Sequence, residues 1–320
     1  MRTDFDFDLS DGTVMKSYAW GAPALVPAAG SGKAPKAVLL IIHGSLEHAL
    51  RYEDFAEFLA DKGIAVYSAD LRGHGRTIRS DAELNYFTDG PNGWRLVLDD
   101  QSAFFSHIRE AHPNRPVFVL GHSMGSFLAR CLAARIGGGM AGLVLSGTGG
   151  APAPLLRGGQ ALAGLSMALG LRRKPNPFLH RLVYGTLNDA IENPQTPSDF
   201  ISRDPETVRA YIADPLSGGT ATTEYIFEML RGFLMAMKTS TYRNTPKDLP
   251  ILLFSGEKDP VAGPKGDAAV LKAAHRAYAK AGIADLTLKI YPEARHEMLN
   301  ETNRAEVYAD VLSWLEERLA

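Results

Sequence analysis

The sequence predicts an α/β protein, with one mostly parallel, eight-stranded sheet flanked by helices and a helical cap inserted before the last strands. Short apolar runs rich in β-branched residues alternate with helical patterns along most of the chain. The later runs are apolar throughout, which is typical of parallel strands that are buried on both faces. One long interval, 148–248, interrupts the alternation and contains no clear strand.

Eight segments have the character of strands. The first two alternate polar and apolar residues around Asp11-Gly12, as a half-exposed hairpin does. The other six are continuous apolar runs that end at Gly, Asp or a similar turn residue. The eight segments are 5–9, 13–20, 36–43, 63–70, 115–121, 141–147, 250–256 and 285–291.

Helical patterns lie between these strands. In 51–63, Phe55, Phe58 and Leu59 share one face, and Gly63 ends the pattern. Because strands and helices alternate, we expect parallel strands joined by right-handed crossovers. The other predicted helices are 93–112, a helix that begins after Ser123, 265–281 and the final segment 304–320.

The interval 148–248 is too long for a simple loop and contains helical patterns with many Pro and Gly residues. Open α/β sheets bind their ligands at the carboxyl ends of the strands, so we expect a helical cap over that edge. Residues 1–147 and 249–320 then form the core. Since both ends of the cap enter this core, the cap is a subdomain rather than an independent domain.

Composition excludes several classes of protein. The 320 residues carry 34 basic and 36 acidic side chains, a net charge of -2, so nucleic acid is not expected as a partner. A single cysteine, Cys131, excludes an internal disulfide and a cysteine-based metal site, and we expect no metal or other cofactor. The amino terminus is polar and no window is apolar enough to span a membrane, which predicts a soluble, cytoplasmic protein.

The segment Gly121-His122-Ser123-Met124-Gly125 follows an apolar strand and precedes a helical pattern. This is Gly-x-Ser-x-Gly at the turn from strand to helix, where the two glycines allow a sharp bend and the serine hydroxyl projects from it. We therefore expect Ser123 to be a nucleophile. The alternative is a tight turn with a capping serine.

A serine hydroxyl is a weak nucleophile unless a base removes its proton and a carboxylate orients that base. His296 follows the last predicted strand, so it lies at the same edge of the sheet as Ser123. The acid is expected from the end of the preceding strand, where Asp259 is favoured over Glu257 and Asp267. His107, His112 and His275 lie in helical patterns and are expected to be ordinary surface residues, and His180 lies in the expected cap.

The chain order Ser123, Asp259, His296 is that of the α/β-hydrolases, and the sequence resembles that superfamily over essentially its whole length. A closer resemblance is carried by Ile42-His43-Gly44-Ser45-Leu46-Glu47-His48-Ala49-Leu50-Arg51-Tyr52. It resembles the His-Gly-x-Gly-Glu-His-x-x-Arg-Tyr signature of monoacylglycerol lipases and bacterial lysophospholipases, which are serine aminopeptidase S33-like hydrolases. The segment 70–76 resembles their Asp-x-Arg-Gly-His-Gly loop, and 202–204, 214–216 and 295–297 are also similar.

This resemblance implies a cofactor-free serine esterase that acts on single-chain lipid esters through an acyl-enzyme. It places the oxyanion hole at the backbone N–H groups of Ser45 and Met124. Leu46 stands where the family has glycine and adds bulk beside the acyl site. We therefore expect substrate contacts from Leu46 and from His122.

Two other functions remain open. An aminopeptidase on the same fold would need a pair of carboxylates in the cap to hold the ammonium group of its substrate. No spacing selects such a pair from the available residues, which are Glu192, Asp204, Glu224 and Glu228. A catalytically silent receptor would keep the fold without turnover, and a fluorophosphonate probe distinguishes it from an enzyme.

The cap contains a mostly apolar stretch, 155–171, followed by the cations of 172–174. One interpretation is a helix packed on the core. The other is a mobile lid that touches lipid aggregates or a membrane surface. Both predict an apolar tunnel over Ser123, and we expect Leu165 and Leu169 to contact the acyl chain.

Overall fold

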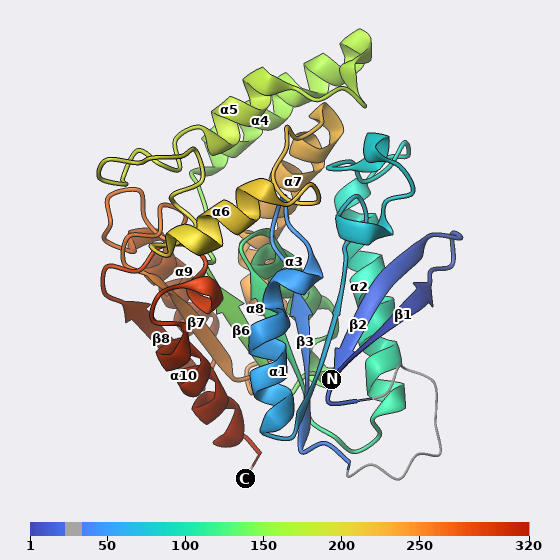
Figure 1. Ribbon diagram of the computed structural model, residues 1–320, viewed down its shortest axis with the longest axis vertical. Helices are drawn as coiled ribbons and strands as arrows, with labels where there is room; N and C mark the ends of the chain where they lie inside the picture. The colour runs from blue at the N-terminus through green and yellow to red at the C-terminus, as the bar shows by residue number, and fades with distance from the viewer. Residues whose placement is uncertain (23–33, 320) are drawn as a thin grey trace.

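An eight-stranded sheet forms the centre of the protein, in a computed structural model that describes residues 1–22 and 34–319 (Figure 1). The strands are β1 (Arg2–Asp8), β2 (Val14–Trp20), β3 (Ala37–Ile42), β4 (Ile64–Ala69), β5 (Val117–His122), β6 (Gly142–Ser146), β7 (Ile251–Gly256) and β8 (Leu286–Tyr291). Their order is β1-β2-β4-β3-β5-β6-β7-β8. Strand β2 is antiparallel to both neighbours, and every other pair is parallel.

The register of the central strands brings their carboxyl ends to one edge of the sheet. Ile42 at the end of β3 lies opposite Gly121 of β5, and His122 lies opposite Ser146 at the end of β6. Loops that leave these ends therefore begin side by side. The expected sites of the nucleophile, the acid and the base all follow strands at this edge.

Helices cover both faces of the sheet (Figure 1). The helices on one face are α1 (Glu53–Asp61) and α10 (Arg304–Glu316), and those on the other are α2 (Gly93–Ala111), α3 (Met124–Ile136), α8 (Thr239–Asn244) and α9 (Ala269–Ala281). Alternate residues of each central strand enter the two hydrophobic cores, which explains why these strands are apolar throughout. Short 3-10 turns span Ala49–Tyr52, Gly75–Thr77, Asp81–Glu83, Gly137–Gly139 and Met298–Asn300.

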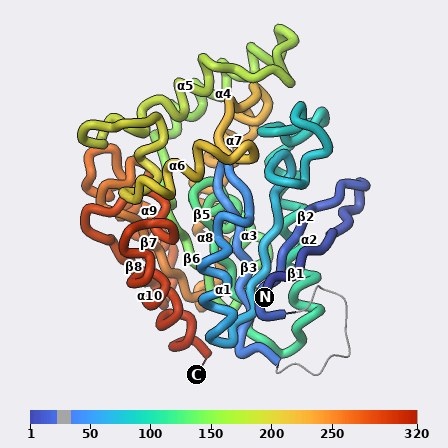
Figure 2. Tube along the Cα trace, in the orientation of Figure 1, coloured from blue at the N-terminus to red at the C-terminus, as the bar shows by residue number. Residues whose placement is uncertain are grey.

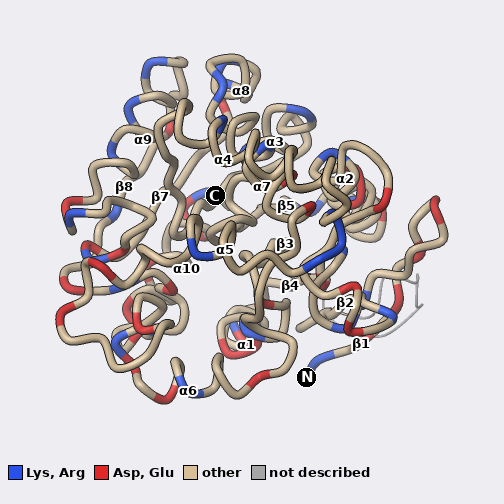
Figure 3. Tube along the Cα trace, turned by 90° about the horizontal axis from the view of Figure 1, so that it is seen from above, with Lys and Arg blue, Asp and Glu red and all other residues tan. Residues whose placement is uncertain are grey.

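The cap follows β6 and returns to the sheet at β7 (Figure 2). It contains α4 (Ala153–Ser166), a π-helical turn (Met167–Leu171), α5 (Pro177–Tyr184), α6 (Pro205–Ala213) and α7 (Thr223–Ala236). Helix α7 packs against α2, α3 and α4 and so joins the cap to the core. Seen from above, α4, α5 and α7 lie over the sheet, whereas α6 lies toward the side of α1 (Figure 3).

The predicted fold class is confirmed, because each expected strand is present within three residues of its predicted bounds. All five helices predicted outside 148–248 are also present. The bounds of the cap stay a prediction, since α8 lies within 148–248 but packs against α3 and α9 of the core. None of the helices in the described part of the chain has the length and apolar character that crossing a bilayer requires.

Candidate active site

Ser123 lies on a sharp turn between β5 and α3. Its backbone has φ 50° and ψ -120°, a conformation that a residue with a side chain rarely adopts. A β-carbon at Gly121 would lie 2.4 Å from the carbonyl oxygen of Gly125, and one at Gly125 would lie 2.2 Å from that of Ile42. The turn therefore requires glycine at both flanking positions, which is the physical basis of the motif.

His296 and Asp259 form a buried hydrogen-bonded pair. The Nδ1 atom of His296 lies 2.9 Å from Oδ1 of Asp259, and both side chains are buried. The hydroxyl of Ser255 donates to the other carboxylate oxygen, and the N–H of Val261 donates to Oδ1 at 2.8 Å. With Nδ1 fixed in this way, Nε2 of the imidazole is left to exchange a proton with a substrate or nucleophile.

The two competing carboxylates serve other purposes. Glu257 accepts the N–H of Glu293, and Asp267 accepts the N–H of Ala269 at the start of α9. Of the three carboxylates weighed from the sequence, Asp259 is the one that the structure brings to His296.

The pair is electrostatically coupled. Burial by itself would raise the pKa of Asp259, but the charge and hydrogen bond of His296 outweigh it and lower that pKa. Burial would lower the pKa of His296, but Asp259 outweighs burial, so the pKa of the imidazole lies above its usual value. The site therefore stabilises a charged imidazolium beside a carboxylate.

Ser123 and His296 line the same cavity of about 420 Å³, which lies beneath the cap. Leu46, His122 and Met124 also line it, and its upper wall consists mainly of apolar side chains from α4, α5 and α7. The ring of His122 lies 4.7 Å from that of His296, centroid to centroid, and its Nδ1 lies 3.1 Å from the hydroxyl of Ser146. The cavity is suited to an apolar chain with a reactive group at one end.

Leu165 and Leu169 do not reach the cavity, which corrects the expectation from the sequence. Their exposed fractions are 60% and 72%, and neither lines the cavity. Successive residues turn by about 100° around a helix, so Leu165 lies about 200° from the buried Ala163 of α4. The cavity is instead lined by Leu155, Leu156 and Gly159, about two to three turns before Leu165.

The turn after β3 lies directly beside the nucleophile. A β-carbon at Gly44 would lie 3.1 Å from Cβ of Ser123, so the turn approaches as closely as glycine allows. No backbone hydrogen bond among the described residues uses the N–H of Ser45 or of Met124, the first residue of α3. Leu46 has a φ of 58°, a backbone conformation that favours glycine over residues with a side chain.

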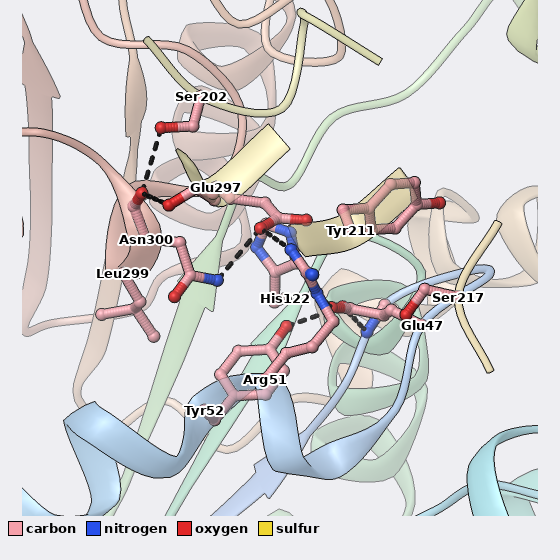
Figure 4. Close-up of polar contacts among 12 residues, drawn as sticks. Glu47, Arg51, Tyr52, His122, Ser202, Tyr211, Ser217, Glu297, Leu299 and Asn300 are labelled. Carbon is pink, nitrogen blue, oxygen red and sulfur yellow. Dashed lines mark hydrogen bonds and ion pairs between the residues drawn. The ribbon is translucent and has the colours of Figure 1, made fainter. Parts of the chain in front are cut away.

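A buried ionic network next to the cavity was missed by the sequence analysis (Figure 4). Arg51 lies between two carboxylates: its Nε is 3.0 Å from Oε2 of Glu47, and its terminal nitrogen pairs with Glu297. The hydroxyl of Tyr52 also donates to Glu47, at 2.7 Å. Both carboxylates line the cavity beside His296. The sequence contained a signal for this network, because its residues belong to the segments 42–52 and 295–297, which resemble the family's motifs. A motif alone, however, does not reveal which of its side chains are in contact.

The carboxylates considered for an aminopeptidase do not reach the cavity within the described part of the chain. Glu224 accepts the N–H of Phe87 at 3.0 Å, and Glu228 accepts the N–H of Trp94 at 3.1 Å. Both are buried between α7 and the start of α2, where burial raises the pKa of Glu224 to about 7. The residues that stay outside the cavity are Glu192, Asp204, Glu224 and Glu228. Across residues 1–22 and 34–319, no group of three or more His, Cys, Asp or Glu side chains is placed to hold a metal ion.

Comparisons with known proteins agree with this geometry. The model of the family "Serine aminopeptidase, S33" matches residues 33–303. A monoacylglycerol lipase of Mycolicibacterium smegmatis is 32% identical over 291 residues, which cover 88% of each chain. Human monoglyceride lipase is 28% identical over 289 residues, covering 89% of this chain and 84% of its own. The crystal structure of a thermostable carboxyl esterase from Bacillus coagulans in complex with glycerol has a TM-score of 0.87 at 25% identity, covering 100% of this chain and 99% of the esterase.

Proposed function

Since the chain belongs to the serine aminopeptidase S33 family of α/β-hydrolases, and is thus a hydrolase, we propose that it cleaves single-chain lipid esters such as monoacylglycerols. The observation that carries this proposal is the cavity, in which Ser123 and the His296–Asp259 pair meet a mainly apolar wall. Two curated relatives that span most of the chain are monoacylglycerol lipases, which supports the same substrate class.

In the first half of the reaction, Ser123 attacks the ester carbonyl while His296 takes its hydroxyl proton. The carbonyl oxygen becomes negatively charged, and the N–H groups of Ser45 and Met124 stabilise it. The tetrahedral intermediate then collapses. His296 gives its proton to the departing alcohol, and the acyl group stays on the serine oxygen.

In the second half, His296 takes a proton from water, whose oxygen attacks the acyl-enzyme. The same two N–H groups hold the second oxyanion, and the proton returns to the oxygen of Ser123 as the fatty acid leaves. Asp259 keeps the imidazole in the tautomer that has a free Nε2 and stabilises its charged form. The raised pKa of His296 is consistent with this role.

An ester substrate fits the cavity better than a peptide with a free amino terminus. The cavity carboxylates Glu47 and Glu297 are both paired with Arg51, so they are not free to bind an ammonium group. The apolar wall favours an acyl chain. Monoacylglycerols should therefore be hydrolysed faster than acetyl esters, bulky triacylglycerols or aminoacyl amides.

The outer side of the cap supports contact with lipid aggregates. Apart from Met1, every exposed large hydrophobic side chain in the described part of the chain belongs to the cap. Two of the three cations that follow are already engaged: Arg172 donates to the carbonyl oxygen of Gly90 at 2.5 Å, and Arg173 pairs with Asp89. Attraction of the cap to a membrane would therefore be mainly hydrophobic. The exposed side chains of 155–182 that do not line the cavity are Leu162, Leu165, Leu169, Leu171 and Phe178, whereas the exposed Leu155 and Leu182 also line it.

The experiment is a panel of monoacylglycerols, p-nitrophenyl esters and aminoacyl amides, each measured with the wild type and with Ser123→Ala. We expect the highest kcat/KM on monoacylglycerols of medium or long chain. We expect Ser123→Ala to lose about four to six orders of magnitude in kcat on every ester. Faster turnover of aminoacyl amides than of esters would contradict the proposed substrate class.

A further inference from the structure

The turn that carries the proposed oxyanion donor Ser45 is held by the cap. The Oγ atom of Ser45 lies 2.6 Å from the hydroxyl of Tyr184 and 2.7 Å from that of Tyr225. Tyr184 is the last residue of α5, and Tyr225 lies in the first turn of α7. The hydroxyl of Tyr225 also lies 3.2 Å from Sδ of Met124, so one side chain contacts both residues of the hole.

The same turn is fixed at the next residue. The carbonyl oxygen of Leu46 accepts the N–H of Gly218 at 2.7 Å and the hydroxyl of Tyr211 at 3.1 Å. Tyr211 lies on α6, so all three of the later cap helices contribute to the turn. A leucine with a φ of 58° persists only where its surroundings impose that conformation. The hydrogen bonds from Gly218 and Tyr211 hold the backbone of Leu46 in that conformation.

The direction of the hydrogen bonds follows from His74. Its Nδ1 lies 3.0 Å from the carbonyl oxygen of Arg72, which can only accept, so Nδ1 carries the proton. Burial lowers the pKa of His74 to about 4, so near neutral pH its Nε2 is an acceptor. The hydroxyl of Tyr225 donates to that Nε2 at 3.0 Å. Its oxygen then accepts from Ser45, whose own oxygen accepts from Tyr184.

Each side chain in this series of hydrogen bonds thus has a donor or an acceptor to pair with. The series runs from the end of α5 through the turn after β3 to the segment 72–74. We propose that the cap completes the oxyanion hole: Tyr184 and Tyr225 are positioning residues that hold Ser45, and through it the backbone N–H, against the reacting carbonyl. The inference rests on the proposed function, because it presupposes that Ser45 supplies an oxyanion donor. It also links catalysis to the outer surface, since α5 carries both Tyr184 and the exposed Phe178 and Leu182.

The test is a double-mutant cycle with Ser45→Ala and Tyr184→Phe on a soluble p-nitrophenyl ester. Both changes keep the backbone N–H and remove only a hydroxyl. Losing an oxyanion donor outright costs ~10²–10³-fold in kcat, so loosening one should cost less, about tenfold. We expect each single variant to lose about tenfold in kcat with KM within twofold, and the double variant to lose no more than the larger single loss.

The matched control is Tyr67→Phe, which removes another buried tyrosine hydroxyl, hydrogen-bonded to His112 at 2.8 Å outside the cavity. We expect this variant to keep the wild-type kcat even if its melting temperature falls. Single-variant kcat values within twofold of wild type, or losses that multiply in the double variant, would overturn the proposal. If Ser123→Ala keeps its activity, the proposed function itself fails, which is a separate result.

Discussion

Replacing Arg51 by methionine tests the buried network beside the catalytic histidine. Arg51 is the cation shared by Glu47 and Glu297, whose side chains are 3% and 7% exposed. The substitution keeps an unbranched side chain but leaves two buried carboxylates without their cation. Breaking a buried pair in this way typically destabilises a protein by about 3–5 kcal/mol. At about 2 °C per kcal/mol, a value suited to a chain of this size, the melting temperature should fall by about 6–10 °C near pH 8.

The stability lost in Arg51→Met should be smaller at low pH than at high pH. Burial and the neighbouring Glu297 already raise the pKa of Glu47, and Arg51 opposes this. Without Arg51, the folded-state pKa of Glu47 moves further above the unfolded value of about 4.3. A raised carboxyl pKa costs stability once the pH passes the unfolded value, so the variant regains stability as the pH falls toward 5.

The assay is thermal unfolding of wild type and variant at pH 5 and pH 8. The control is Arg79→Met, because Arg79 is an exposed partner of Glu83 and its removal should change the melting temperature little at either pH. An Arg51→Met variant as stable as the control, or one destabilised equally at both pH values, would refute this reasoning.

Three further outcomes are expected. For Asp259→Asn, we expect kcat to fall by about 10⁴-fold. The acidic limb of the pH profile of kcat/KM should also move to lower pH, because Asp259 raises the pKa of His296. An acidic limb with an unchanged midpoint would contradict this. Leu169→Asp should impair hydrolysis of micellar monoacylglycerol but spare a short soluble ester, since Leu169 is 72% exposed and does not line the cavity beneath the cap. Equal losses on both substrates would favour a cap that acts only by packing. Leu46→Gly should relieve the backbone strain at a φ of 58° and widen the cavity, so kcat/KM should rise for branched acyl esters relative to straight ones; unchanged selectivity would count against contact between Leu46 and the acyl group.

The sequence predicts the sheet well because each central strand is buried on both faces and is therefore apolar throughout. The positions of Ser123, Asp259 and His296 at one edge follow from the same topology, since parallel strands bring their carboxyl ends together. The local sequence pattern is therefore sufficient to predict the strands and the edge of the sheet at which these three residues lie.

Contacts between distant segments could not be predicted in this way. Arg51 and Glu297 are separated by 246 positions, and Ser45 and Tyr225 by 180, so no local spacing indicates either pair. The face of α4 was also ambiguous, because 155–171 is apolar around much of its circumference and lacks the polar stripe that would orient it. Leu165 and Leu169 were therefore assigned to the wrong side of the cap.

The central claim is that Ser123 forms a covalent acyl-enzyme in the cavity beneath the cap. The most direct measurement is the mass of the intact protein and of its peptides after reaction with an alkyl fluorophosphonate, in wild type and in Ser123→Ala. We predict one adduct per chain, located on Ser123, with ester hydrolysis lost in proportion to labelling and no adduct in the variant. An unlabelled wild-type protein that still hydrolyses esters, or an adduct on another residue, would contradict the account.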